Sequence, residues 1–115
     1  RLAELGYWKA ALSAIEEAVK IRRDLALKRP DAFLPSLAIS LVNMTACLVN
    51  LDDHSAALSP NEEAVKILRG LADTLPAVFR KELRNSLISL STVLNALGRP
   101  EEAAAAAAEA AGLED

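Results

Sequence analysis

The stretch ALSAIEEAVKI at residues 11–21 returns almost unchanged as ALSPNEEAVKI at residues 57–67. The two copies are 46 residues apart, counted from residue 11 to residue 57. The same offset continues along the chain without a gap and relates Leu5 to Leu51, Pro30 to Pro76, Phe33 to Phe79, Leu37 to Leu83 and Leu41 to Leu87. A repeat of roughly 20–50 residues is typical of a solenoid, in which each unit buries its apolar face against its neighbours.

Each repeat is predicted to form two helices, so the chain is predicted to be all-α. The first long helix is expected from about Tyr7 to Lys28 and ends at Pro30, because the residue before a proline leaves the α region. Pro35 is expected in the first turn of the next helix, where its missing N–H costs nothing. The expected order is a short helical tail before residue 7, four long helices and a final alanine-rich helix.

Two apolar stripes run side by side along the helix expected at residues 7–28. A helix needs two such stripes when it is packed both by its own partner and by the next unit. The first stripe contains Leu12, Ile15, Val19 and Ala26, and the second contains Ala14, Ala18, Ile21 and Leu25.

Pro60 leaves two arrangements open in the second copy. The Ser-x-x-Glu sequence from Ser59 is a capping box with proline at the first helical position, so a helix could begin there. Alternatively, the helix begins near Asp53 and Pro60 lies inside it, removing one backbone hydrogen bond. Residues 56–58 keep the register of their counterparts, which favours a continuous but kinked helix. Asn61 replaces an isoleucine of the first copy, which predicts poorer packing at that layer.

The composition bounds the class of protein. The chain has 115 residues, enough for one domain, and is 52% apolar but only 3% aromatic, which predicts an aliphatic core. The net charge is −3 and no basic block occurs, so nucleic-acid binding is not expected. Cys47 is the only cysteine, which favours a reducing, cytoplasmic setting. No apolar run is expected to reach the ~18–20 residues that span a membrane, and the start at Arg1 indicates an excerpt of a longer protein.

Several residues of the repeat resemble the signature of the tetratricopeptide repeat, a two-helix unit. In that family a Leu-Gly pair closes the first helix and is followed by an aromatic residue and two spaced alanines. The corresponding residues here are Leu5, Gly6, Trp8, Ala11 and Ala18 in the first copy, Ala57 and Ala64 in the second, and Leu97, Gly98, Ala103 and Ala110 in the third. The first-helix signature corresponds to Leu41, Met44, Thr45 and Leu48, and then to Leu87, Leu90, Ser91 and Leu94.

The resemblance implies a right-handed superhelical solenoid of antiparallel helix hairpins. It implies one repeat domain over residues 1–115, with units at about 2–47 and 48–93 and a partial unit at 94–115. The period exceeds the usual length of about 34 residues. This long form is similar to kinesin light chain repeats and to the arrays that follow nucleotide-binding domains in receptor-like signalling ATPases. The phrases LADTLPAVFRKEL and LNALGRPEEA favour the second group.

Two departures from the family pattern carry information. Asp52 and Asp53 replace the usual closure after the first helix, where glycine supplies a left-handed cap, although aspartate tolerates that conformation better than most residues. Residues 103–108 are all alanine, which keeps a helix but buries little surface, as expected of an end cap or a weakly docked terminal helix.

The sequence does not predict an enzyme, a cofactor or a metal site. His54, the only histidine, follows two aspartates in an expected turn, and three consecutive residues rarely converge on one ion. Adjacent glutamates do not face each other on a helix. Cys47 is expected to be a buried thiol, and the glycines do not have the spacing of a phosphate loop. Tyr7 and Trp8 are expected to pack in the core or in a turn, with ligand contact as the alternative.

The resemblance also implies that the first helix of each unit lines a concave groove. The groove positions correspond to Ile39, Val42, Asn43, Ala46, Val49 and Asn50, and in the next unit to Asn85, Ile88, Ser89, Thr92, Asn95 and Ala96. In kinesin-light-chain-like arrays the asparagine equivalent to Asn43 binds a peptide backbone, and a carboxamide suits this task because it both donates and accepts. Lysine and arginine are absent from these positions, so a clamp for a C-terminal carboxylate is not expected.

The function expected from these features is that of a non-catalytic protein–protein interaction module that presents its groove to a peptide or protein partner. Neither nucleic acid nor membrane is expected as a partner. The alternative is a structural segment that self-associates, because the exposed ends of a short repeat array can stack on other repeats or on other copies.

Overall fold

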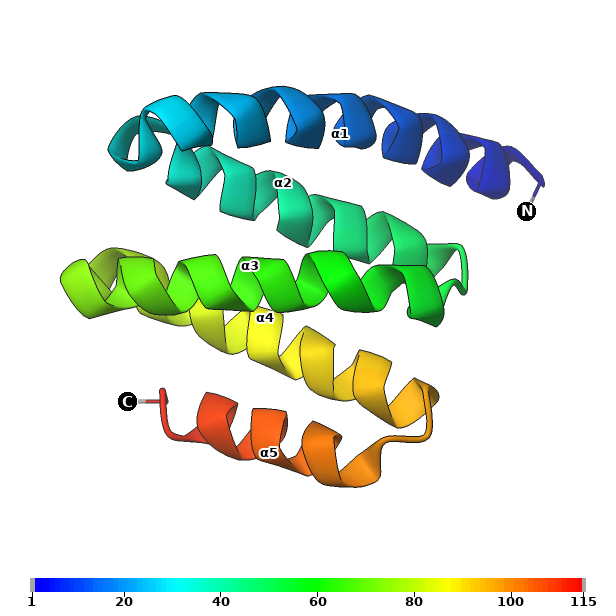
Figure 1. Cartoon of the computed structure of the whole chain (residues 1–115). Coiled ribbons are helices and arrows are strands. Elements are labelled where there is room, and N and C mark those ends of the chain that lie inside the picture. Colours follow the sequence, from blue (N-terminus) through cyan, green and yellow to red (C-terminus); the bar gives the residue numbers. More distant parts are fainter. Residues whose placement is uncertain (1, 115) are drawn as a thin grey trace.

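The computed structural model describes residues 2–114 of the chain and consists of five helices joined by short connections. The helices are α1 (Leu2–Lys28), α2 (Pro30–Asn50), α3 (His54–Thr74), α4 (Pro76–Ala96) and α5 (Pro100–Ala111). Consecutive helices run in opposite directions and stack in the order of the chain (Figure 1). The predicted all-α stack of helix hairpins is therefore confirmed, while the division into units near residues 48 and 94 stays a prediction.

Prolines set the start of three helices. Pro30, Pro76 and Pro100 each occupy the first turn, where the missing N–H leaves no hydrogen bond unmade. Pro35 was expected in such a position, but this expectation is wrong. Because α2 already begins at Pro30, Pro35 lies inside the helix, and Arg29 alone separates α2 from α1.

The first helix also differs from the expectation. The tail before residue 7 and the helix expected from Tyr7 form one continuous helix of 27 residues, so Gly6 does not close a helix. A single glycine costs a helix only about 1 kcal/mol, and the residues around Gly6 are acceptable helix formers. Residues 3–7 are all exposed, and the N-terminal end of α1 projects beyond the end of α2 (Figure 1).

The two longer connections share one geometry. After α2, Asp52 has a φ of 61° and donates its N–H to Val49 O (2.9 Å), while Asp53 N–H donates to Leu48 O (2.8 Å). After α4, Gly98 has a φ of 74° and donates its N–H to the carbonyl of Asn95. These paired bonds form the Schellman motif, in which a left-handed residue lets the last carbonyls of a helix find partners.

The third helix resolves the question of Pro60. α3 is one helix from His54 to Thr74 with Pro60 inside it, so the preferred continuous helix is confirmed and a start at Ser59 is wrong. Its N-cap is Asp53, whose Oδ1 accepts the N–H of Ala56 at 3.1 Å. This cap satisfies one of the otherwise unpaired donors in the first turn.

The core is aliphatic, as the composition predicts. Ala38, Ala57 and Ala64 are completely buried, because small side chains allow neighbouring helices to approach closely. The larger buried side chains are mainly leucine and valine, namely Leu37, Leu41, Leu48, Val65, Leu68, Leu83, Leu87, Leu90, Val93 and Leu94. The first stripe of α1 packs into this core, with Val19 and Ala26 buried, whereas the second stripe is largely open and leaves Ile21 exposed.

The second helix is more apolar than expected. By length and composition alone α2 could cross a membrane, with a mean hydropathy of 1.8, so the expectation that no such run exists is wrong. In the structure α2 packs against both α1 and α3, which buries part of this apolar surface. The equally packed α3 and α4 are more polar, so packing on two sides does not by itself account for the hydropathy of α2.

Candidate functional site

The twelve groove candidates lie on α2 and α4 and remain accessible. Nine of them are exposed, namely Ile39, Asn43, Ala46, Asn50, Asn85, Ile88, Thr92, Asn95 and Ala96, and the other three, Val42, Val49 and Ser89, are half-buried. The spacing of Ile39, Asn43, Ala46 and Asn50 is that of one helical face. The structure therefore presents equivalent faces of the two helices to solvent, and their role in binding stays a prediction.

Some polar groups on these faces already have partners within their own helix. The Asn50 amide donates to Ala46 O at 2.8 Å, and the Thr92 hydroxyl donates to Ile88 O at 3.2 Å. For Asn43 and Asn85, no partner occurs within residues 2–114, so both carboxamides remain available to a ligand. Asn50 already uses one of its two amide N–H groups, which makes it a weaker candidate than the sequence indicates.

A small pocket of about 60 Å³ lies where α2, α3 and α4 meet. Three of the predicted groove residues, Val42, Asn85 and Ser89, line it. The other lining residues, which the sequence analysis did not identify as binding residues, are Thr45, Asn61, Glu82 and Ser86. The sequence feature that could have indicated this pocket is Asn61, a polar residue at a position where the first copy has isoleucine.

Asn61 is the unusual residue of this pocket. It is only 2% exposed, and its amide Nδ2 donates to Ser86 O at 3.1 Å. Its Oδ1 is buried and has no hydrogen-bond partner within the described chain. A buried acceptor without a partner costs stability, because its hydration is lost and nothing replaces it. Asn61 therefore introduces a polar defect into this layer, while the poorer packing expected there stays a prediction.

Other residues line a second, larger pocket of about 230 Å³ between α4 and α5. The α4 wall includes Ile88 and Thr92 from the predicted groove, and Arg84 and Ser91 complete it. The opposite wall consists of Ala107, Ala110 and Ala111 of α5 and of Glu114, which follows this helix. The accessible face of α4 therefore continues toward α5 as well as toward α2.

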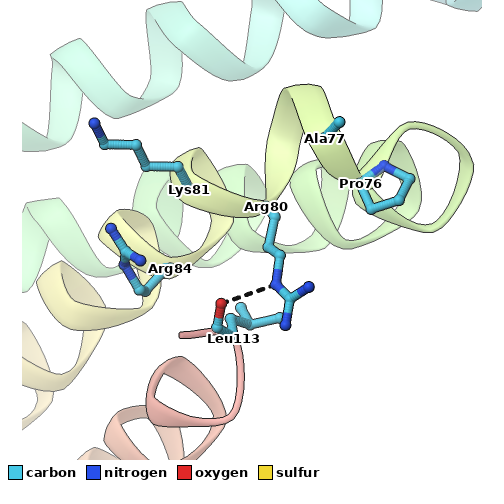
Figure 2. Close-up of a pocket in the computed structure, with 6 residues that line it drawn as sticks. All are labelled: Pro76, Ala77, Arg80, Lys81, Arg84 and Leu113. Atoms are coloured by element: carbon cyan, nitrogen blue, oxygen red, sulfur yellow. Dashed lines mark hydrogen bonds between the residues drawn. The ribbon is translucent and has the colours of Figure 1, made fainter. Parts of the chain in front are cut away.

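A basic pocket of about 570 Å³ lies at the start of α4, beside the C-terminal end of α5. Figure 2 shows Arg80 extending to Leu113, while Lys81 points away from Leu113 and Pro76 and Ala77 lie at the start of α4; Arg84 also lines the pocket. Arg80 Nε donates to the Leu113 carbonyl at 2.8 Å, which ties the end of α5 to α4. These charges belong to the RKELR sequence at residues 80–84. The pocket was not predicted, because these residues lie outside the expected groove.

The reactive side chains have structural roles. Cys47 is buried as predicted, and burial raises the pKa of its thiol, so the reactive thiolate is disfavoured. Asp53 caps α3, and His54 Nδ1 lies 3.6 Å from Asp52 Oδ1. Within residues 2–114, no three histidine, cysteine or acidic side chains gather in a metal-binding group.

The aromatic pair lies apart from the groove faces. Tyr7 is 64% exposed and contacts Trp8 edge to face, with ring centroids 5.1 Å apart. The expectation of core or turn packing is therefore wrong for Tyr7, because the helix continues through Gly6 and carries Tyr7 on its exposed N-terminal part.

Comparison with known proteins gives a family match. The sequence model described as Anaphase-promoting complex subunit 5 matches residues 2–29, 25–77 and 75–113, which together cover nearly the whole chain. No curated protein and no solved structure matches the chain. The repeats of this family are tetratricopeptide-like. Its members are non-catalytic scaffold subunits, in agreement with the prediction that the chain is not an enzyme. The chain, with five stacked helices and an open face on α2 and α4, belongs to the anaphase-promoting complex subunit 5 family.

Proposed function

We propose that the chain is a protein-interaction module that holds an extended segment of a partner protein along α2 and α4. The observation that carries this proposal is the pair of equivalent accessible faces, 46 residues apart, each of which presents apolar and carboxamide side chains, although at different positions of the repeat. The family is named for a subunit of a multiprotein complex, which supports a protein as the ligand. We place that partner among the proteins of the anaphase-promoting complex, and the module inside the cell, in the cytoplasm.

The proposed mechanism is rigid presentation. Ile39 and Ile88, both 51% exposed, offer apolar surface for partner side chains. Asn43 and Asn85 offer a donor and an acceptor each, which matches the N–H and C=O of an extended peptide. Because both helices pack against α3, the two walls are already in position, and binding requires little ordering of the module. The use of Asn43 follows the kinesin-light-chain-like arrays that this repeat resembles.

The test places a photo-crosslinking amino acid at position 46 or 92 on the proposed groove, or at position 24 on the exposed side of α1. Each labelled chain is mixed with purified anaphase-promoting complex, and crosslinked peptides are identified by mass spectrometry. Positions 46 and 92 should crosslink to one segment of a partner, and Asn43→Ala with Asn85→Ala should abolish this product. Crosslinks only from position 24 would contradict the groove.

Self-association is a second candidate, supported by a different observation. Leu27 is 80% exposed and lies in an apolar pocket of about 510 Å³ that also includes Leu34, Leu37 and Ile67. Exposed apolar surface of this kind favours contact between copies. Light scattering over a range of concentrations would show a rising mass that Leu27→Glu abolishes. A constant monomer mass would exclude this candidate.

A further inference from the structure

The pocket between α2 and α4 is too small for a whole ligand but large enough for the end of a side chain. Its volume is about 60 Å³, which accommodates a group of a few non-hydrogen atoms. Five of its seven lining residues lie among the proposed groove residues or within one residue of them, so a segment lying along the groove would pass over its mouth. Such a segment could insert one side chain into it.

The orientation of Asn61 determines what that side chain must offer. The Ser86 carbonyl can only accept a hydrogen bond, so the Asn61 atom that faces it at 3.1 Å is the amide nitrogen. The carboxamide oxygen therefore faces the other way, and it is the atom that is buried without a partner. The pocket thus requires a hydrogen-bond donor.

The surrounding groups indicate that this donor is positively charged. Thr45 donates its hydroxyl hydrogen to Leu41 O at 2.8 Å, so its oxygen is left as an acceptor. Glu82 contributes a carboxylate, and it forms no ion pair within residues 2–114. No lysine or arginine lines this pocket. The basic residues Arg80, Lys81 and Arg84 of α4 line the separate pocket at the start of that helix.

The first hairpin contains a related contact made within the chain. Ser40 stands 46 residues before Ser86, and its hydroxyl accepts a hydrogen bond from the guanidinium of Arg22. The residue equivalent to Arg22 in the second hairpin is Leu68, which is buried and cannot donate. The first hairpin therefore supplies its own cation at this serine, and the second does not.

We propose that the pocket formed by Thr45, Asn61, Glu82, Ser86 and Ser89 binds the positively charged end of a lysine or arginine side chain from the partner segment. This proposal rests on the proposed groove function and specifies its chemistry. The Asn61 oxygen and the Thr45 hydroxyl accept the N–H donors, and the Glu82 carboxylate at the exposed side balances the charge. A charge-assisted hydrogen bond is stronger than a neutral one, so this residue would fix the register of the segment.

The test uses small cations in place of the unidentified partner. The 15N-labelled chain is titrated at constant ionic strength with n-butylammonium, n-butylguanidinium or neutral n-butanol, and NMR follows the Asn61 side-chain amide and the Ser86 and Ser89 amides. Saturable shifts are expected with the cations only. The cation that binds more tightly identifies lysine or arginine as the preferred residue. Equal shifts with n-butanol would overturn the charge assignment.

Three variants test whether the cation binds in this pocket. Glu82→Gln should weaken cation binding by about fivefold, the effect of one partly exposed ion pair, without affecting folding because Glu82 is exposed. Asn61→Leu should abolish the saturable shifts while its melting temperature stays equal or rises. Unchanged cation binding in both variants would overturn the proposal. Asn43→Ala, outside the pocket, should retain cation binding, so loss of the partner crosslink in the double asparagine variant tests the groove separately.

Discussion

Asp52 and Gly98 stand at the same position of the two connections that follow α2 and α4, and both have a left-handed backbone. Glycine adopts this conformation freely, whereas a residue with a Cβ is strained there. No atom lies within 4 Å of a Cβ built on Gly98, so the cost of a side chain at that position is purely conformational. The connection at Asp52 is therefore the less favourable of two otherwise equivalent turns.

Substitutions at the glycines should have opposite effects. Gly98→Ala is expected to lower the free energy of unfolding by about 1 kcal/mol, because alanine is strained at a φ of 74°. Gly70→Ala, inside α3 with the same open surroundings, is expected to raise it by about 1 kcal/mol. Asp52→Gly should also stabilise the chain. Urea unfolding followed by circular dichroism measures all three, and effects of the same sign at Gly70 and Gly98 would contradict this account.

The third helix shows how an element tolerates an unfavourable residue. Pro60 is buried inside α3 and cannot donate the hydrogen bond that a helix interior normally makes. The helix continues because Asp53 caps its start and because Ala57, Ala64, Val65 and Leu68 bury its inner face. Packing therefore outweighs a local defect that could otherwise end the helix.

Replacing this proline should stabilise the chain. Pro60→Ala restores the missing N–H and reproduces the residue of the first copy, so the free energy of unfolding is expected to rise by about 1–2 kcal/mol. Pro76→Ala is the matched control, because Pro76 occupies the first turn of α4, where no hydrogen bond is missing. Chemical unfolding of both variants tests this, and equal effects at the two prolines would show that the lost hydrogen bond is not the cause.

Polar contacts, in addition to the packing of its alanines, hold α5 against the other helices. Arg69 of α3 makes two hydrogen bonds to the Glu109 carboxylate, at 2.9 and 2.7 Å, and Ser91 donates to Ala103 O at 2.8 Å. The guanidinium hydrogen bonds lower the pKa of Glu109 below its ordinary value of 4.5. A lowered pKa in the folded state means that the contribution to stability is present above the ordinary value and is lost as the pH falls through the lowered one.

The pH dependence of this contact can be measured. At about pH 7, Glu109→Gln should lower the free energy of unfolding by only about 0.5 kcal/mol, because both side chains are more than a third exposed. The difference from the unchanged chain should shrink as the pH falls below 4.5. Glu101→Gln, at an exposed glutamate of the same helix, is the control. A difference that persists in acid would exclude the ion pair as its source.

The whole molecule is a row of helices in which the closest backbone contacts join neighbours in the chain, while side-chain ion pairs also join α1 to α3 and α3 to α5. The central helices pack closely against two chain neighbours, whereas α1 and α5 each pack closely against one. In such repeat structures stability is approximately a sum of local terms, so it should be lowest at the ends. The first turns of α1 are the extreme case, since residues 3–7 are all exposed.

Hydrogen exchange should reveal this gradient. Backbone amides of residues 3–7 are expected to exchange fastest among the helical residues, and those around Leu68, Leu87 and Val93 slowest, because these side chains are almost completely buried. Mass spectrometry of peptides after timed exchange gives the comparison. Uniform protection along the chain would indicate that the helices unfold as a single cooperative unit.

The sequence predicted the stack because its 46-residue period carries the apolar pattern from one hairpin to the next. It also predicted that Asp52 would tolerate the turn and that residues such as Asn43 would be accessible. It failed where a local motif had no tertiary support, as at Gly6, which the Leu-Gly pattern marked as a helix end. It could not predict the pocket at Asn61, because that pocket requires α2, α3 and α4 to bring together residues distant in the chain. The resemblance to receptor-like signalling ATPases gains no support from the family match.

The stacking of the helices in chain order has a mechanical consequence. A pulling force applied to the two termini would load α1 and α5 first, since each packs closely against only one neighbouring helix. The end-to-end length of the molecule would then increase in small steps, each of which releases one helix. When the force is removed, the helices would dock again in the opposite order. Such a body behaves as a soft spring, and a partner bound across α2 and α4 would stiffen its middle while leaving both ends extensible.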